Sequence, residues 1–187
     1  MEAKICSALK FNFNYDTPYK YIDKFLRASF ATKDGKTANV SIRKMMEHMV
    51  LYLVDLSLLE YKFVKVKPSL VTAAAVYLAR ATLGIREVPV INNLDPLKDP
   101  NMTVTDDLKW KRVPMGFWTR TLEHHTGYDE WDLEKSVKML RRLHENAESN
   151  HLKSIYSKFK SDQFGKIAFK TVLNESDLNL DILYCCK

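Results

Sequence analysis

Acidic and histidine side chains at helical spacing are the first feature of this sequence that could do chemistry. Glu148 and His151 stand three residues apart, the spacing of carboxylate-bridged metal sites in helix bundles. Such a site needs a second pair of this kind and two further glutamates, and neither Glu47-His48 nor Glu123-His124-His125 has the spacing. Because residues 147–150 are typical of a turn, we expect Glu148 and His151 to be solvated rather than metal ligands.

The residues that nucleophilic catalysis requires do not form a recognisable motif either. The sequence has no glycine-rich phosphate loop and no G-x-S-x-G. Nothing pairs Cys6 with a base. We expect His144, on an otherwise apolar face, to be a hydrogen-bonded core residue, and His124-His125 to complement a helix dipole. The sequence therefore predicts a protein that is not an enzyme, with no catalytic, cofactor-binding or metal residues and no cofactor.

Composition indicates one ordinary globular domain. The chain has 187 residues, of which 46% are hydrophobic and 28% charged, with a net charge of +6. No apolar run approaches the roughly 20 residues that a membrane-spanning helix needs. The three cysteines, Cys6, Cys185 and Cys186, give no disulfide framework. We expect an intracellular protein, in the nucleus, the cytoplasm or both, with no membrane contact.

Prolines and glycines divide the chain into segments with helical periodicity. The predicted helices cover about 18–30, 39–59, 67–83, 117–126 and 129–148, with a shorter sixth over 151–160. Asp16 or Thr17 is expected to cap the first, with Pro18 at its first position. Apolar positions include Met45, Met46 and Met49 in the second helix, which we interpret as core. Ile42 in the second helix and Leu152 in the sixth belong to the same apolar patterns.

The segment 67–83 is apolar or small on almost every face, which indicates a helix surrounded by other helices. Gly84 is expected to follow its C-terminus. The stretch from Gly84 to Pro114 is long for a connection in a compact domain, so it is expected to be functional or mobile. Of the tryptophans, Trp118 is expected to be packed, and Trp110 could anchor this long loop. With no segment of sustained alternation, the predicted fold is all-α: five main helices around a central buried one, plus a short C-terminal helix.

Several short motifs occur in a particular order along the chain. They are Ala8–Phe13 with Asp16-Thr17-Pro18 and Phe25-Leu26, Leu53–Leu59, Lys67–Ala75, Thr126-Gly127-Tyr128, and Ile155–Phe159. In this order they resemble the C-terminal cyclin box of A/B-type (mitotic) cyclins over roughly residues 8–170. Asp55 stands where the family usually has Glu, and the long loop at 84–114 is a further departure from the family pattern.

This resemblance implies a five-helix cyclin-box bundle in a regulatory subunit of a cyclin-dependent kinase, acting in cell-cycle control without chemistry of its own. It assigns residues 1–12 to a linker or the remnant of a preceding domain, 13–173 to the C-terminal cyclin box with 84–114 as a loop insertion, and 174–187 to a tail. The first cyclin box, which carries most kinase contacts in the family, does not occur in this sequence. Ile5, Leu9 and Phe11 could then be exposed and drive self-association.

A basic stretch near the C-terminus leaves one alternative open. Residues 141–170 hold seven basic side chains against three acidic ones, a net +4: Arg141, Arg142, Lys153, Lys158, Lys160, Lys166 and Lys170. Aromatic residues lie between them, which is also seen in nucleic-acid-binding surfaces. The alternative is thus a transcription-factor-like cyclin fold that contacts DNA through this face. Because the charge is mild, nucleic acid is an unlikely partner on this prediction, and a solvated or protein-docking face is favoured.

Overall fold

The computed structural model describes residues 1–31, 40–85 and 117–171, and every regular element in these ranges is helical. The α-helices are α1 (Glu2–Ala8), α2 (Tyr19–Ser29), α3 (Val40–Ser57), α4 (Pro68–Thr82), α6 (Arg120–Thr126), α7 (Glu130–Glu145) and α8 (Ser154–Phe159). The 3-10 helices are η1 (Tyr61–Lys65), η2 (Asp162–Phe164) and η3 (Ile167–Phe169). The predicted all-α fold is confirmed. Most of the predicted loop 84–114, with Trp110, and the tail 174–187 lie outside the described residues.

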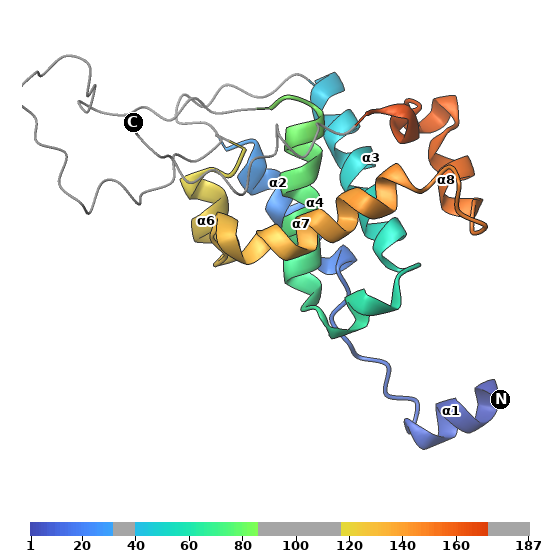
Figure 1. Ribbon diagram of the computed structural model, residues 1–187. Helices are drawn as coiled ribbons and strands as arrows, with labels where there is room; N and C mark the ends of the chain where they lie inside the picture. Colours follow the sequence, from blue (N-terminus) through green and yellow to red (C-terminus); the bar gives the residue numbers. More distant parts are fainter. Residues whose placement is uncertain (32–39, 86–116, 172–187) are drawn as a thin grey trace, which may run out of the picture.

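Helix α4 is the centre of the bundle, and α2, α3 and α7 pack against it (Figure 1). All eleven residues from Val71 to Ala81 are buried. Five of these are alanines, whose small side chains let neighbouring helices approach on several sides at once. The predicted central helix over 67–83 is therefore confirmed to within a residue at each end.

Helix α3 supplies a second buried surface through the methionine and leucine positions of its sequence pattern. Met46, Met49 and Leu53 are fully buried, as predicted, and Met45 packs against them from a half-buried position. The inclusion of Ile42 in this stripe was wrong, since its side chain is 38% exposed. The reason is that the whole first turn of α3, residues 40–44, is exposed, so the helix enters the core only from Met45.

Two helices end at the glycines predicted from the sequence, but the predicted N-cap of α2 was wrong. Gly84 (φ +67°) and Gly127 (φ +73°) both adopt the left-handed conformation that terminates α4 and α6. At the start of α2, Pro18 itself is the N-cap and no side chain caps the helix. The Asp16 carboxylate is occupied elsewhere, because it accepts hydrogen bonds from Lys20 Nζ and the Tyr21 hydroxyl.

The C-terminal helices cover α3 on the side away from α2, where α8 and η3 both contact it (Figure 1). Phe159 and Ile167 are buried there. The sixth helix starts later than predicted, at Ser154 rather than near His151. Leu152 therefore precedes it and is 51% exposed, which corrects its placement in the apolar pattern. None of the helices in the described ranges is long and apolar enough to cross a bilayer.

Candidate docking surfaces

The residues whose spacing suggested metal chemistry are exposed and apart from the core. Glu148 and His151 are both exposed and lie in the turn region between α7 and α8. His124 and His125 end α6 in solvent, with ring centroids 5.3 Å apart. Across residues 1–31, 40–85 and 117–171, no three His, Cys, Asp or Glu side chains gather in a way that could hold a metal ion. The solvated interpretation of Glu148 and His151 agrees with this placement.

His144 is a hydrogen-bonded core residue, as predicted. Its Nε2 lies 2.7 Å from the carbonyl oxygen of Lys170. Because a carbonyl oxygen can only accept, Nε2 is protonated and donates this hydrogen bond. Its Nδ1, 3.2 Å from the Tyr52 hydroxyl, is then the acceptor. Desolvation lowers the pKa of His144, partly offset by the bond to the Lys170 carbonyl, and burial raises the pKa of Tyr52. Both rings are thus held neutral, and they join α3, α7 and the segment after η3.

Polar side chains at four positions along α4 form hydrogen bonds to neighbouring segments. The periodicity of the sequence did not reveal these bonds. Near its start, the hydroxyls of Ser69 and Tyr128 share a hydrogen bond of 2.7 Å. One turn later Thr72 Oγ1 donates to the carbonyl of Pro18 at 2.6 Å. The Tyr77 hydroxyl donates to Glu130 Oε1 at 2.7 Å.

The fourth polar side chain of α4 that bonds to neighbouring segments is Arg80, which is 1% exposed. Its Nε donates to the carbonyl of Phe117 and its Nη1 donates to the carbonyl of Ser29, each at 2.7 Å. Because these carbonyls belong to the end of α2 and to the residues before α6, a single guanidinium holds three parts of the chain in one geometry.

A groove lies between α2 and α3. It has a volume of about 560 Å³. Its apolar lining comprises Tyr19, Ile22, Leu26, Phe30 and Leu51, and its charged lining Asp23, Arg27, Arg43 and Glu47. The two cations are engaged locally: Arg27 pairs with Asp23 at 2.8 Å, and Arg43 lies over the Phe30 ring at 5.4 Å. With charges of both signs, the groove could receive an apolar side chain of a partner but favours neither charge sign.

Acidic side chains neutralise several of the cations of residues 141–170 in the folded structure. Lys158 pairs with Asp55 of α3 at 3.0 Å, Lys166 with Asp162 at 2.9 Å, and Arg141 with Glu145 at 2.8 Å. Of the aromatic residues between the cations, Tyr156 and Phe159 are buried and serve packing, whereas Phe169 is exposed beneath Lys160. A continuous positive track for a nucleic-acid backbone therefore does not form from these seven cations, and the DNA-binding alternative gains no support.

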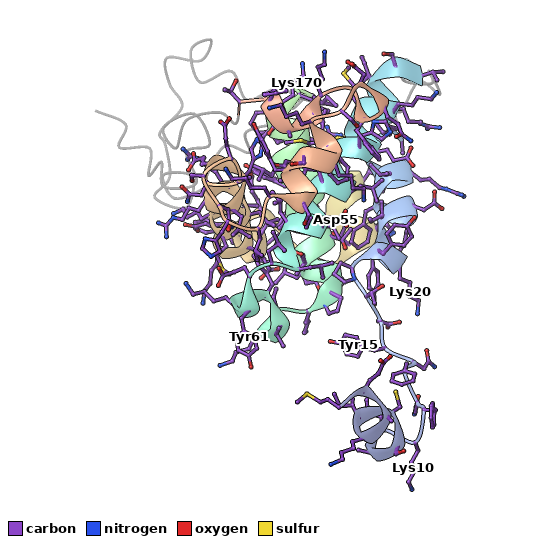
Figure 2. All side chains as sticks on the ribbon, turned by 90° about the vertical axis from the view of Figure 1, so that its right-hand side faces the viewer. Lys10, Tyr15, Lys20, Asp55, Tyr61 and Lys170 are labelled. Atoms are coloured by element: carbon purple, nitrogen blue, oxygen red, sulfur yellow. The ribbon has the colours of Figure 1, made fainter. Side chains whose placement is uncertain are left out.

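The N-terminal segment presents apolar side chains to solvent. Helix α1 has no buried residue, and both views show it at the end of an extended strand of chain, away from the bundle (Figures 1 and 2). Ile5, Leu9, Phe11 and Phe13 are each about half exposed or more. The expected exposure of Ile5, Leu9 and Phe11 is thus what the structure shows.

This helical body can be compared with known protein families. The family model described as "Cyclin, C-terminal domain" matches residues 17–173, which include all the helices from α2 to η3. That match covers most of the chain. The chain belongs to the cyclin family. The resemblance to the C-terminal cyclin box of A/B-type cyclins is confirmed by relatives of both types.

Plant cyclins are among the relatives of this cyclin chain. Cyclin-B1-1 of Oryza sativa subsp. japonica is 33% identical over 91% of the chain, which covers 30% of that protein. The G2/mitotic-specific cyclin-1 of Antirrhinum majus is 30% identical over 90% of the chain, covering 27% of that protein. Cyclin-A2-4 of Arabidopsis thaliana is 29% identical over 90%, covering 29%. The chain thus spans less than a third of the length of these cyclins.

Proposed function

We propose that this chain is the C-terminal cyclin box of a mitotic-type cyclin and works inside the cell as part of the regulatory subunit of a cyclin-dependent kinase. The observation that carries this proposal is the cyclin C-terminal match over residues 17–173, on a bundle whose central helix α4 is buried from Val71 to Ala81. A relative named G2/mitotic-specific cyclin-1 supports the assignment to the mitotic class and to cell-cycle control.

The proposed role is docking without catalysis. The polar groups inside the bundle serve its architecture: Arg80 and His144 are engaged by backbone carbonyls of other segments. A body held in one shape by such contacts suits a subunit that acts by presenting fixed surfaces to a kinase and stabilising its active arrangement.

The N-terminal residues 1–12 are proposed to be the linker or remnant that joins this box, residues 13–173, to a preceding one. In support, α1 contributes nothing to the core, and Leu9 and Phe11 expose apolar side chains that a neighbouring domain would cover. Since the first box makes most of the kinase contacts in the family that this chain resembles, residues 1–187 alone are expected to bind kinase weakly or not at all.

The test joins residues 1–187 to the part of rice Cyclin-B1-1 that precedes its matching region. Co-purification of the fusion with a plant cyclin-dependent kinase, and stimulation of its kinase activity, are the expected results. A matched fusion carrying Ala74→Asp, which places a charge at a fully buried position of α4, should lose both. If the intact fusion recovers no kinase, or if residues 1–187 alone stimulate the kinase robustly, the proposal is wrong.

A further inference from the structure

The segment joining α3 to α4 exposes an unusual number of apolar side chains. Leu58, Tyr61 and Val64 are 71%, 79% and 68% exposed. Between them, Phe63 is buried, and Leu59 and Val66 pack against the core. Single exposed apolar residues need no explanation, but three within seven residues are a local concentration of exposed apolar side chains, and such concentrations mark candidate interaction sites.

This patch is held rigidly by η1. The Phe63 amide donates to the carbonyl of Glu60, and the Val66 amide to that of Phe63, each at 3.0 Å. In a 3-10 helix residues three apart are eclipsed, so Tyr61 and Val64 form one row and Lys62 and Lys65 a neighbouring one. Figure 2 shows Tyr61 at the end of the bundle, with its side chain pointing away from the helices. The backbone hydrogen bonds of η1 therefore fix the positions from which Tyr61 and Val64 project into solvent.

The charged side chains of this surface are mainly basic. Lys62, Lys65 and Lys67 are exposed, and none of them forms an ion pair with an acidic side chain in the part of the chain described here. The nearby Glu60 carboxylate accepts a bond from the Lys62 amide, which directs it to the turn's own backbone. The first turn of α4, which follows directly, contains no acidic residue. By contrast, Lys158 and Lys166 of the C-terminal segment are both paired, with Asp55 and Asp162.

We propose that Leu58, Tyr61, Lys62, Val64, Lys65 and Lys67, here named the η1 surface, dock an acidic amphipathic helix of a partner protein. Three residues of a 3-10 helix rise about 6 Å, so Tyr61 and Val64 are spaced like side chains one turn, about 5.4 Å, apart on an α-helix. Apolar side chains of the partner then meet the Tyr61–Val64 row, and its carboxylates meet the lysines. This charge complementarity selects acidic partners.

A protein partner fits this surface better than an anionic membrane. Stable membrane attachment through basic residues uses clusters of about four to eight cations or a long amphipathic helix. The η1 surface offers three lysines and one short turn, a size suited to one helical segment. The inference does not depend on kinase binding, because the η1 surface is complete within residues 1–187.

The test uses residues 1–187 and two synthetic peptides labelled with a fluorophore. One peptide is an acetylated helix former with leucines at i, i+4 and i+7 and glutamates at the flanking positions, and the other has these leucines replaced by alanine. Anisotropy is expected to show saturable binding of the leucine peptide, weakened by added salt. Lys62→Glu with Lys65→Glu should weaken it roughly tenfold or more, because each substitution turns an attraction into a repulsion. Tyr61→Ala with Val64→Ala should weaken it similarly.

The matched control is Lys153→Glu with Lys160→Glu, an equal charge change at exposed positions around α8, and it should leave peptide binding unchanged. Equal binding of the alanine peptide, equal loss in the control variant, or no saturable binding would overturn the proposal. So would tighter binding of the protein to phosphatidylserine vesicles than to the peptide.

In the fusion with the rice cyclin segment, Lys62→Glu with Lys65→Glu should leave kinase co-purification intact. Loss of the kinase there would show that this surface belongs to the kinase interface instead.

Discussion

The Nε atom of Arg80 donates a hydrogen bond to the carbonyl oxygen of Phe117 at 2.7 Å, within the buried interior of the bundle. The two residues are 37 positions apart and neither side chain is exposed. Because the same guanidinium also donates to Ser29, it links the central helix to the end of α2 and to the start of the α6 region. The relative placement of these segments thus depends on one buried cation.

Replacing this cation should destabilise the fold strongly. Arg80→Met keeps much of the volume but removes the hydrogen bonds that the guanidinium donates to the carbonyls of Ser29 and Phe117, and each bond to a charged group contributes about 1.5–3 kcal/mol. We expect a loss of at least about 2 kcal/mol in the free energy of unfolding, measured by urea denaturation. Arg27→Met, at an exposed pair with Asp23, is the control and should change it by less than about 0.5 kcal/mol. Equal effects at the two sites would contradict the structural role given to Arg80.

The turn between α6 and α7 should be sensitive to the backbone conformation of Gly127. Its φ of +73° is unfavourable for residues with a Cβ, yet a Cβ built there would meet no atom within 4 Å. Gly127→Ala should therefore cost about 1–2 kcal/mol through backbone strain alone. Gly127→Asn, which tolerates this conformation better, should cost less. If both variants unfold at the wild-type urea midpoint, the left-handed cap is not formed in solution.

Stability should fall as the solution is acidified, because of His144. Desolvation lowers its pKa in the folded state, whereas in the unfolded chain it returns to about 6.5. Below that value the unfolded state binds the proton more readily, so the free energy of unfolding decreases as pH falls through about 6.5. The total decrease is about 1.4 kcal/mol for each unit by which the folded pKa lies below the unfolded one. An NMR titration should place the folded pKa of His144 below the unfolded value of about 6.5. His144→Gln should flatten the pH profile of stability between about pH 7 and 5. An unchanged profile in that variant would refute the assignment.

The lysine that precedes α4 should limit the stability of the bundle. Lys67 is the N-cap of α4, where a positive charge opposes the helix dipole and no side chain caps the first turn. Lys67→Asp supplies both an acceptor and a favourable charge, and should stabilise the fold by about 0.5–2 kcal/mol. Lys67→Met, which removes the charge without adding an acceptor, should give a smaller gain. A loss of stability in Lys67→Asp would show that Lys67 has a structural role not evident from its contacts.

Features carried by local sequence signals were predicted correctly. The central position of α4 followed from its alanines and from apolar residues on all faces, and its end followed from Gly84. The start of α2 was predicted to within a residue, but its cap was wrong, because Pro18 is the N-cap and the Asp16 side chain bonds to Lys20 and Tyr21 rather than to the helix end. Propensity alone does not decide between such competing partners.

Long-range polar contacts could not be predicted in the same way. His144 was expected to be hydrogen-bonded in the core, but its partner Tyr52 is 92 positions away. The burial of Arg80 has no signal in periodicity, since arginine usually marks a solvated face. The η1 surface had a faint signal, the three-residue spacing of Leu58, Tyr61 and Val64, which matches the period of a 3-10 helix.

The central claim is that α4 is the buried core of a rigid docking body, and native-state hydrogen exchange of residues 1–187 tests it most directly. Amides from Val71 to Ala81 are expected to exchange most slowly, and only through global unfolding, with protection that matches the free energy from urea denaturation. The amides of α1, which has no buried residue, should exchange fastest among the helices. Exchange of the α4 amides as fast as those of α1 would contradict the buried central helix and the docking body built around it.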